Sequence, residues 1–311
     1  MLDLRRYKAQ YLLGVVLVFL SVSGLSGCAL LTPARSEVPA DTVRAKLKAP
    51  TLATDKVLTI GIPANDAPQV ATDSQGKLTG YYVDLGLALA KKLGLKASFM
   101  PGSSPDKAGL SGGPDIYLGA SATGRYTTAV VTSSILQDAP ALFAKKGQNS
   151  SVGAAQLQGA SIAVQGGSAA QDALTKTGIV ADEVIVTNIN DAFKAVAEGR
   201  ASYALCRADA GAFIARTFED MHFVGTLGSA EILGFAARTG SSELIAQVSQ
   251  ALSALESDGT IDAIYQAWYG ALPRTLNESL VNGIMITNSN SSQQSLTQVS
   301  ATPSNLSSPS R

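Results

Sequence analysis

The order of apolar and polar positions divides the chain into a central part, in which strand-like and helix-like segments alternate, and two flanks without a regular pattern. Residues 57–62 (VLTIGI) form a short apolar run that predicts a buried strand. Residues 77–82 follow a Ser-Gln-Gly turn signal and predict a hairpin. In residues 83–93 apolar side chains recur at helical spacing and Gly94 follows directly, which predicts a helix that ends there.

The same alternation continues toward the C-terminus. Short apolar runs predict further strands at 115–119, 161–164, 184–186, 203–205 and 233–237. Helical spacing predicts helices over 192–198 and 243–255. A further helix is expected to begin at Gly167-Ser168 and run to Leu174, and a last one to end at Trp268. Strands that alternate with helices in this way indicate an α/β protein with mostly parallel sheets and flanking helices.

The N-terminal flank has the three parts of a bacterial lipoprotein signal. A basic start (Arg5, Arg6 and Lys8) precedes an apolar run over 11–20, and the motif LSGC ends at Cys28. The run is shorter than the roughly 20 residues that a spanning helix needs. LSGC resembles the lipobox, which implies cleavage of a signal peptide (residues 1–27) and acylation of Cys28, so that the lipid bilayer is a partner. An uncleaved signal anchor with a passenger cysteine is the alternative.

Two other segments lack the pattern of a folded element. Residues 28–55 are rich in Ala, Pro and Thr and predict a flexible spacer between the lipidated cysteine and the domain. Residues 283–311 become almost entirely Ser, Asn, Gln and Thr. Such a segment buries too little apolar surface to offset the entropy of ordering, and it predicts a disordered tail.

Composition removes several classes of protein. The 311 residues contain 46% apolar and 15% charged residues, so the chain can bury a core. Lys and Arg together number 24, as do Asp and Glu, and this balance excludes the basic surface of a nucleic-acid binder. With Cys28 lipidated, Cys206 has no disulfide partner, and one histidine with one free thiol does not make a zinc site. We expect no cofactor and no metal.

Several segments in the central part carry a resemblance to a known family. They are, in chain order, VLTIGIPANDAPQ, KLTGYYVDLGLALAKKLGLK, GGPDIYLGASATGRY, LQGASIAVQGGSA, DAFKAVAEGRASYAL and LIAQVSQALSALESDGTIDAIYQAWYG. Their order and spacing from Val57 to Gly270 resemble the family 3 extracellular solute-binding proteins, the polar amino acid receptors of ABC transporters. A single match would be weak, but collinear matches over this length are specific.

The resemblance implies a periplasmic-binding-protein fold of type II, with two lobes joined by two hinge crossovers. Lobe 1 would consist of residues 56–146 and 232–282, and lobe 2 of residues 150–231. A small ligand would lie in the cleft between them and favour the closed state. The family also implies a monomer outside the cytoplasm, anchored to the cell membrane here by lipid, that delivers its solute to an ABC permease.

The resemblance also points to residues for a carboxylate-bearing ligand. Arg125 lies at the family's arginine, although the spacing before it is shortened to Thr123-Gly124-Arg125, and a guanidinium can bind a carboxylate through two hydrogen bonds. Ser168 begins a helix after two glycines, where free N–H groups can hold an anion. Gly119, Ser121 and Thr123 would line the loop before Arg125. The alternatives are a surface arginine, a plain helix cap and ordinary turn residues.

The chain departs from the family where a ligand's ammonium would bind. Arg207 stands where the family has an acidic residue, and Asp209 follows two positions later. The first loop carries Pro68-Gln69 in place of an aromatic wall. One hypothesis is a ligand with a second acidic group that Arg207 receives. In the alternative, Arg207 points to solvent and the pocket, which includes Gln69, uses Asp66 or Asp209 for the ammonium.

Three functions remain open at this point. The leading prediction is a non-catalytic receptor that binds a small carboxylate, an amino acid or a relative of one. A sensor or accessory lipoprotein with lost or altered ligand binding is the first alternative. A dehydratase-like enzyme on the same fold is the second, but the sequence contains neither a GxSxG nor an HExxH motif, and it predicts no catalytic residue.

Overall fold

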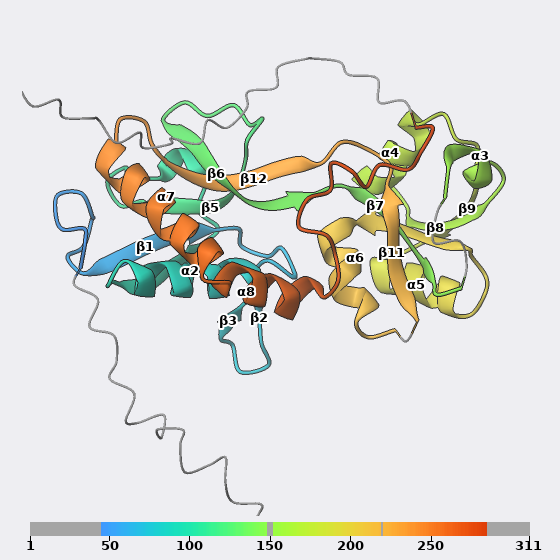
Figure 1. Ribbon diagram of the computed structural model, residues 1–311, viewed down its shortest axis with the longest axis horizontal. Coiled ribbons are helices and arrows are strands. Elements are labelled where there is room, and N and C mark those ends of the chain that lie inside the picture. The colour runs from blue at the N-terminus through green and yellow to red at the C-terminus, as the bar shows by residue number, and fades with distance from the viewer. Residues whose placement is uncertain (1–44, 148–151, 219, 285–311) are drawn as a thin grey trace, which may run out of the picture. The chain divides into compact units, whose positions relative to one another are not determined.

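The computed structural model describes residues 45–147, 152–218 and 220–284 (Figure 1). The predicted signal peptide, Cys28, most of the predicted spacer and nearly all of the predicted polar tail lie outside this range. Among the helices that are described, none combines the length and the apolar character needed to cross a bilayer.

The first of two five-stranded sheets has the order β4-β1-β5-β12-β6. β1 pairs in parallel with β4 and β5, whereas β12 is antiparallel to both β5 and β6. The strands are β1 (Val57–Ile62), β4 (Lys96–Pro101), β5 (Ile116–Ser121), β6 (Ala129–Asp138) and β12 (Glu231–Arg238). Four of the six residues of β1 are buried and the other two partly buried, as its largely apolar sequence predicts.

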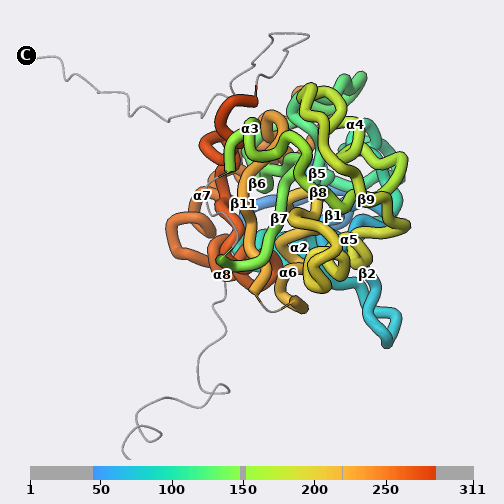
Figure 2. Tube along the Cα trace, turned by 90° about the vertical axis from the view of Figure 1, so that its right-hand side faces the viewer, coloured from blue at the N-terminus to red at the C-terminus, as the bar shows by residue number. Residues whose placement is uncertain are grey.

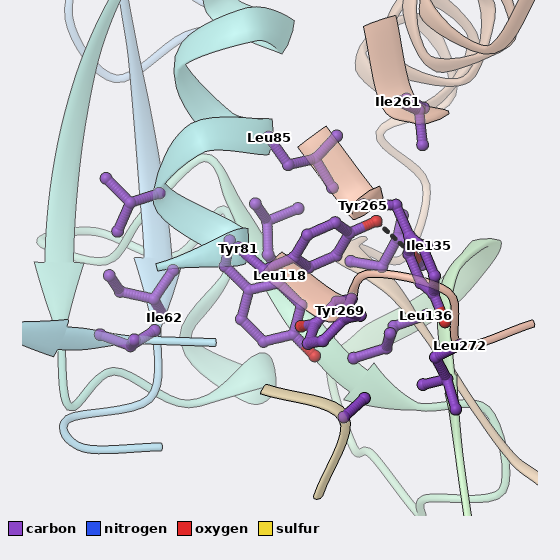
Figure 3. Close-up of a cluster of buried hydrophobic side chains, with 14 of the residues drawn as sticks. Ile62, Tyr81, Leu85, Leu118, Ile135, Leu136, Ile261, Tyr265, Tyr269 and Leu272 are labelled. Carbon is purple, nitrogen blue, oxygen red and sulfur yellow. Dashed lines mark hydrogen bonds between the residues drawn. The ribbon is translucent and has the colours of Figure 1, made fainter. Parts of the chain in front are cut away.

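Three helices pack beside the first sheet, α2 (Tyr81–Lys92), α7 (Ser242–Ser257) and α8 (Thr260–Tyr269). Figure 3 shows the aromatic centre of this lobe, where the ring of Tyr269 lies 5.2 Å from that of Tyr81 and 4.8 Å from that of Tyr265. The hydroxyl of Tyr81 donates to the carbonyl of Ile135 at 2.7 Å, so this buried polar group is satisfied. Smaller elements are β2 (Ala71–Thr72), β3 (Leu78–Thr79) and the 3-10 turn η1 (Pro105–Lys107).

The second sheet has the order β11-β7-β10-β8-β9. β8 pairs in parallel with β9 and β10, and β7 is antiparallel to β10 and β11. The strands are β7 (Pro140–Lys145), β8 (Ser161–Gln165), β9 (Asp182–Val186), β10 (Tyr203–Arg207) and β11 (Met221–Thr226). The helices are α3 (Ala154–Leu157), α4 (Ala169–Lys176), α5 (Ile189–Ala197) and α6 (Ala208–Ala215).

The two lobes are joined where strands of one sheet lead directly into strands of the other. β6 continues through Ala139 into β7, and β11 leads through residues 227–230 into β12 (Figure 1). The predicted α/β class with two lobes and two hinge crossovers is therefore confirmed. The first crossover lies at Ala139, earlier than the implied boundary at residue 146. The strands on either side of the crossovers pair antiparallel with their neighbours, β6 with β12 in the first sheet and β7 with β10 and β11 in the second.

The segment after α8 also crosses between the lobes, and we call residues 276–284 the C-terminal strap. The N–H of Leu276 donates to Oε1 of Gln137 in β6 at 2.8 Å. Farther along, the N–H of Val281 donates to the carbonyl of Thr226 at 2.9 Å, so the strap extends the second sheet beside β11 (Figures 1 and 2). The resemblance implied lobe 1 up to residue 282, but the end of the strap lies on lobe 2.

Candidate functional site

Four of the predicted site residues lie at the carboxyl ends of parallel strands. β1 and β5 run parallel, so Asp66 and Arg125, which follow them, lie beyond the same edge of the first sheet. β8 and β10 run parallel in the second sheet, where Ser168 follows β8 and Arg207 ends β10. Ligands of open α/β sheets bind at such edges.

The structure brings these two edges together through Arg207. Its Nη1 lies 2.8 Å from Oδ1 of Asp66, which belongs to the loop after β1 in the other lobe. Its Nε lies 2.8 Å from Oδ2 of Asp138 at the end of β6, and its Nη2 lies 2.5 Å from Oδ2 of Asp209 in α6. Arg207 therefore does not simply point to solvent, as the alternative reading of the sequence had it, because three carboxylates hold its guanidinium.

The four side chains differ in how much water reaches them. The exposed fraction of the side chain is 42% for Arg207, 29% for Asp66, 10% for Asp138 and zero for Asp209. Gln69 is also fully buried, and its Nε2 donates to Oδ2 of Asp209, a further contact between the lobes. Its Oε1 has no hydrogen-bond partner among the described residues.

Burial and charge shift the pKa values of this cluster. Burial, followed by the negative charge of Asp138, raises the pKa of Asp209 to about 7, although Arg207 acts in the opposite direction. Burial also raises the pKa of Asp138. Burial lowers the pKa of Arg207, but the charges of its carboxylate partners outweigh this and raise it. The cluster therefore retains a proton close to neutral pH.

The loop after β5 has its own hydrogen bonds. The hydroxyl oxygens of Ser121 and Thr123 lie 3.2 Å apart, and the hydroxyl of Tyr126 donates to the carbonyl of Ser121 at 3.2 Å. Arg125 is exposed, and it makes no hydrogen bond or ion pair with any residue that the structure describes. Its guanidinium is thus open to a ligand, and its role in binding a carboxylate stays a prediction.

Gly119 has a structural reason for being glycine. Its φ is +89°, and a Cβ at this position would lie 2.6 Å from the ring of Tyr82, which is buried beneath it. The close approach of Tyr82 accounts for the glycine without a ligand.

Ser168 caps α4 in the ordinary way. Its Oγ accepts from the N–H of Gln171 at 3.2 Å, while the N–H of Gly167 donates to Oε1 of Gln171 at 2.7 Å. This is the helix-cap alternative named from the sequence. In this structure the hydroxyl of Ser168 and the N–H of Gly167 are both engaged within the turn, and their role as an anion site stays a prediction.

The sequence did not point to Asp138 or Tyr126. Asp138 follows Gln137 and stands directly before Ala139-Pro140, and only that proline marks a change in the chain there. Its partner Arg207 is 69 positions away in the sequence. The pairing arises because β7 and β10 align Pro140 with Arg207 across the second sheet.

Comparisons with known proteins agree with the two-lobed fold. The L-cystine solute receptor of Neisseria gonorrhoeae, in its unliganded open conformation, is 24% identical, with a TM-score of 0.60 over 70% of this chain and 94% of that chain. A polar amino acid ABC uptake transporter substrate-binding protein from Streptococcus thermophilus is 20% identical, with a TM-score of 0.62 over 71% and 88%. At these identities the likeness supports the fold.

An ancestral cationic amino acid solute-binding protein is 27% identical, with a TM-score of 0.59 over 69% of this chain and 96% of that chain. No curated protein matches the chain. The family model of the bacterial extracellular solute-binding proteins, family 3, matches residues 58–271, from the first strand of lobe 1 to the end of the last helix. The chain therefore belongs to the bacterial extracellular solute-binding proteins of family 3.

Proposed function

We propose that this chain is the membrane-anchored, extracytoplasmic receptor of an ABC transporter, and that it binds a small carboxylate-bearing solute, an amino acid or a close relative, between its lobes. The observation that carries the proposal is the ion pair between Asp66 and Arg207. This pair joins the carboxyl-end edges of both sheets, so groups on these two edges can act on one solute. Binding across a hinge favours closure, which is the signal that a transporter needs.

In this proposal Arg125 binds the carboxylate of the solute. It is exposed and makes no other interaction with the described residues, so a bidentate pair would cost no existing bond. Ser121 and Thr123 would add hydroxyl groups from the same loop, and Gly119 a carbonyl. The turn at Ser168 would meet the solute from lobe 2, where a helix N-terminus favours negative charge.

Anchoring and delivery form the second part of the proposal. The basic start, apolar run and LSGC motif support acylation of Cys28. Two or more acyl chains hold a protein on a bilayer stably. We propose that the receptor acts there as a monomer beside its permease, and the named amino acid receptors among the similar structures support an amino-acid-sized solute.

Isothermal titration with a panel of amino acids and dicarboxylates tests the proposal. We expect saturable binding of at least one solute by the native chain. Replacing Arg125 with Ala should weaken that binding by roughly 100-fold, because a bidentate charge-assisted pair is lost. The control is Arg200→Ala, which removes an arginine that pairs with Glu198 at 2.9 Å on the surface of lobe 2. Equal affinities of the two variants would contradict the role of Arg125.

A sensor or accessory lipoprotein is the second candidate, and one observation favours it. The three carboxylates at the junction already bind Arg207, so lobe contacts form without a solute. A thermal-shift screen separates the candidates. If no amino acid or dicarboxylate raises the melting temperature, the receptor proposal is contradicted and the sensor or accessory function is favoured.

A further inference from the structure

Three carboxylates from three separate segments converge on one point between the lobes. Asp66 comes from the loop after β1, Asp138 from the end of β6 and Asp209 from the first turn of α6. We call these three residues the carboxylate cage. Ionised acids in one place repel one another unless a cation lies among them, and within the described structure that cation is the guanidinium of Arg207.

The deepest member of the cage has no capacity left for a solute. Oδ1 of Asp209 accepts from Nε of Arg207 at 3.1 Å and from the N–H of Ala210 at 2.5 Å. Oδ2 accepts from Nη2 of Arg207 at 2.5 Å and from Nε2 of Gln69. Because the side chain is also fully buried, an ammonium group in the cleft cannot reach it.

Asp138 is nearly as inaccessible. Its Oδ2 accepts from Nε of Arg207 at 2.8 Å, and its Oδ1 accepts from the N–H of Asp209 at 3.2 Å. Asp66, with 29% of its side chain exposed, and Arg207, with 42%, are the most exposed of the four side chains. A guanidinium has five N–H donors and three nitrogens, so Arg207 keeps donors beyond the ones that the cage uses.

We propose that Arg207 determines the specificity of the inter-lobe site by acting as an internal cation, which fills the carboxylate cage and keeps the cationic group of a solute out of it. This inference rests on the proposed function and names its substrate class. The preferred solutes are carboxylates for which an ammonium group adds little to the affinity. A second cation beside Arg207 would be repelled by it and would find two of the three cage acids already bonded and buried.

The first experiment uses the native chain and pairs of solutes that differ only in an ammonium group. The pairs are L-glutamate with glutarate, L-aspartate with succinate and L-alanine with propionate, measured by isothermal titration. For whichever pair binds, we expect affinities within roughly threefold of each other. A preference of more than roughly 100-fold for the amino member would overturn the inference and leave the receptor proposal standing. If no pair binds, the wider panel of amino acids and dicarboxylates decides the receptor proposal, and the second experiment decides the role of Arg207.

The second experiment empties the cage with Arg207→Ala and adds methylguanidinium as a replacement cation. We expect a lower melting temperature for the variant and a saturable rise toward the native value at millimolar methylguanidinium. The native chain and the surface control Arg200→Ala should show no such rise. If the variant folds only in the presence of methylguanidinium, the inference is also supported. The inference about Arg207 is contradicted if methylguanidinium does not stabilise the variant, or if the variant fails to fold even in its presence.

Discussion

At the scale of single residues, the excess of acids over bases in the carboxylate cage makes the stability of the fold depend on pH. The pKa of Asp209 is raised to about 7, chiefly by burial. In the unfolded chain an aspartate titrates near pH 4. Between these values the native state holds a proton that the unfolded state releases. The resulting stabilisation is complete below about pH 4 and is lost as the pH rises through about 7.

The variant Asp209→Asn tests this dependence because it keeps the shape of the side chain but cannot titrate. Between pH 5 and pH 8 we expect the free energy of unfolding of the native chain to fall, relative to the variant, by on the order of 2 kcal/mol. Urea denaturation at the two pH values measures it. Asp258→Asn is the control, since the hydrogen bond from Lys92 is the main cause that lowers the pKa of Asp258 to about 2, and its charge is constant over this range. A native-to-variant difference that is the same at pH 5 and pH 8 would refute the prediction.

Gly119 allows a second test at this scale, because a matched glycine separates two effects. Gly119 and Gly240 have nearly the same φ, +89° and +88°, but an added Cβ meets the ring of Tyr82 only at Gly119. We expect Gly240→Ala to cost about 1 kcal/mol through φ alone. Gly119→Ala should cost at least about 2 kcal/mol, since the ring must also move. Thermal or urea unfolding of both variants measures the two losses of stability. Equal losses would show that the ring of Tyr82 moves aside without an energetic cost.

The sequence predicted part of the site at this scale. The pattern of family residues drew attention to Arg207 and Asp209, which do lie together with Asp66 and Gln69. It could not reveal that they bind one another, because these partners lie up to 141 positions apart in the sequence. Asp138 was missed for the same reason. It follows the polar Gln137 with no motif to mark it, and only the pairing of β7 with β10 brings it to Arg207.

At the scale of elements, the sequence succeeded where burial follows a simple period. The run at Val57–Ile62 is a strand with the predicted bounds, and the helices that begin at Tyr81 and Ser242 follow the predicted apolar spacing. α6 was missed because five of its residues in succession, Ala208–Ala212, are buried, so no polar face marks its period. β6 and β7 were missed because together they form one nearly continuous extended segment. Before Ala139 this segment pairs with a strand of the first sheet, and after Ala139 with strands of the second.

At the scale of the whole described chain, contacts other than the two strand crossings also tie the lobes together. The ring of Phe213 in α6 stacks on Trp268 in α8, with centroids 5.8 Å apart, and Nη1 of Arg216 donates to the carbonyl of Trp268 at 3.3 Å. The C-terminal strap adds a further link, and it lies beyond residue 271, where the match to the family ends. Each of these links resists a change in the angle between the lobes.

The strap can be tested at Val281, a residue that is 4% exposed and whose N–H donates to the carbonyl of Thr226 at 2.9 Å. Val281→Pro removes that donor, so we expect the strap to detach from β11 and the range of distances between the lobes to widen. Spin labels at the exposed positions Lys91 in lobe 1 and Lys176 in lobe 2 report that range by double electron–electron resonance. Val281→Ala keeps the N–H and loses only apolar contact, so its distances should stay close to those of the native chain while its stability falls by about 1 kcal/mol. If both variants keep the native distances, the strap follows the movement of the lobes without restraining it.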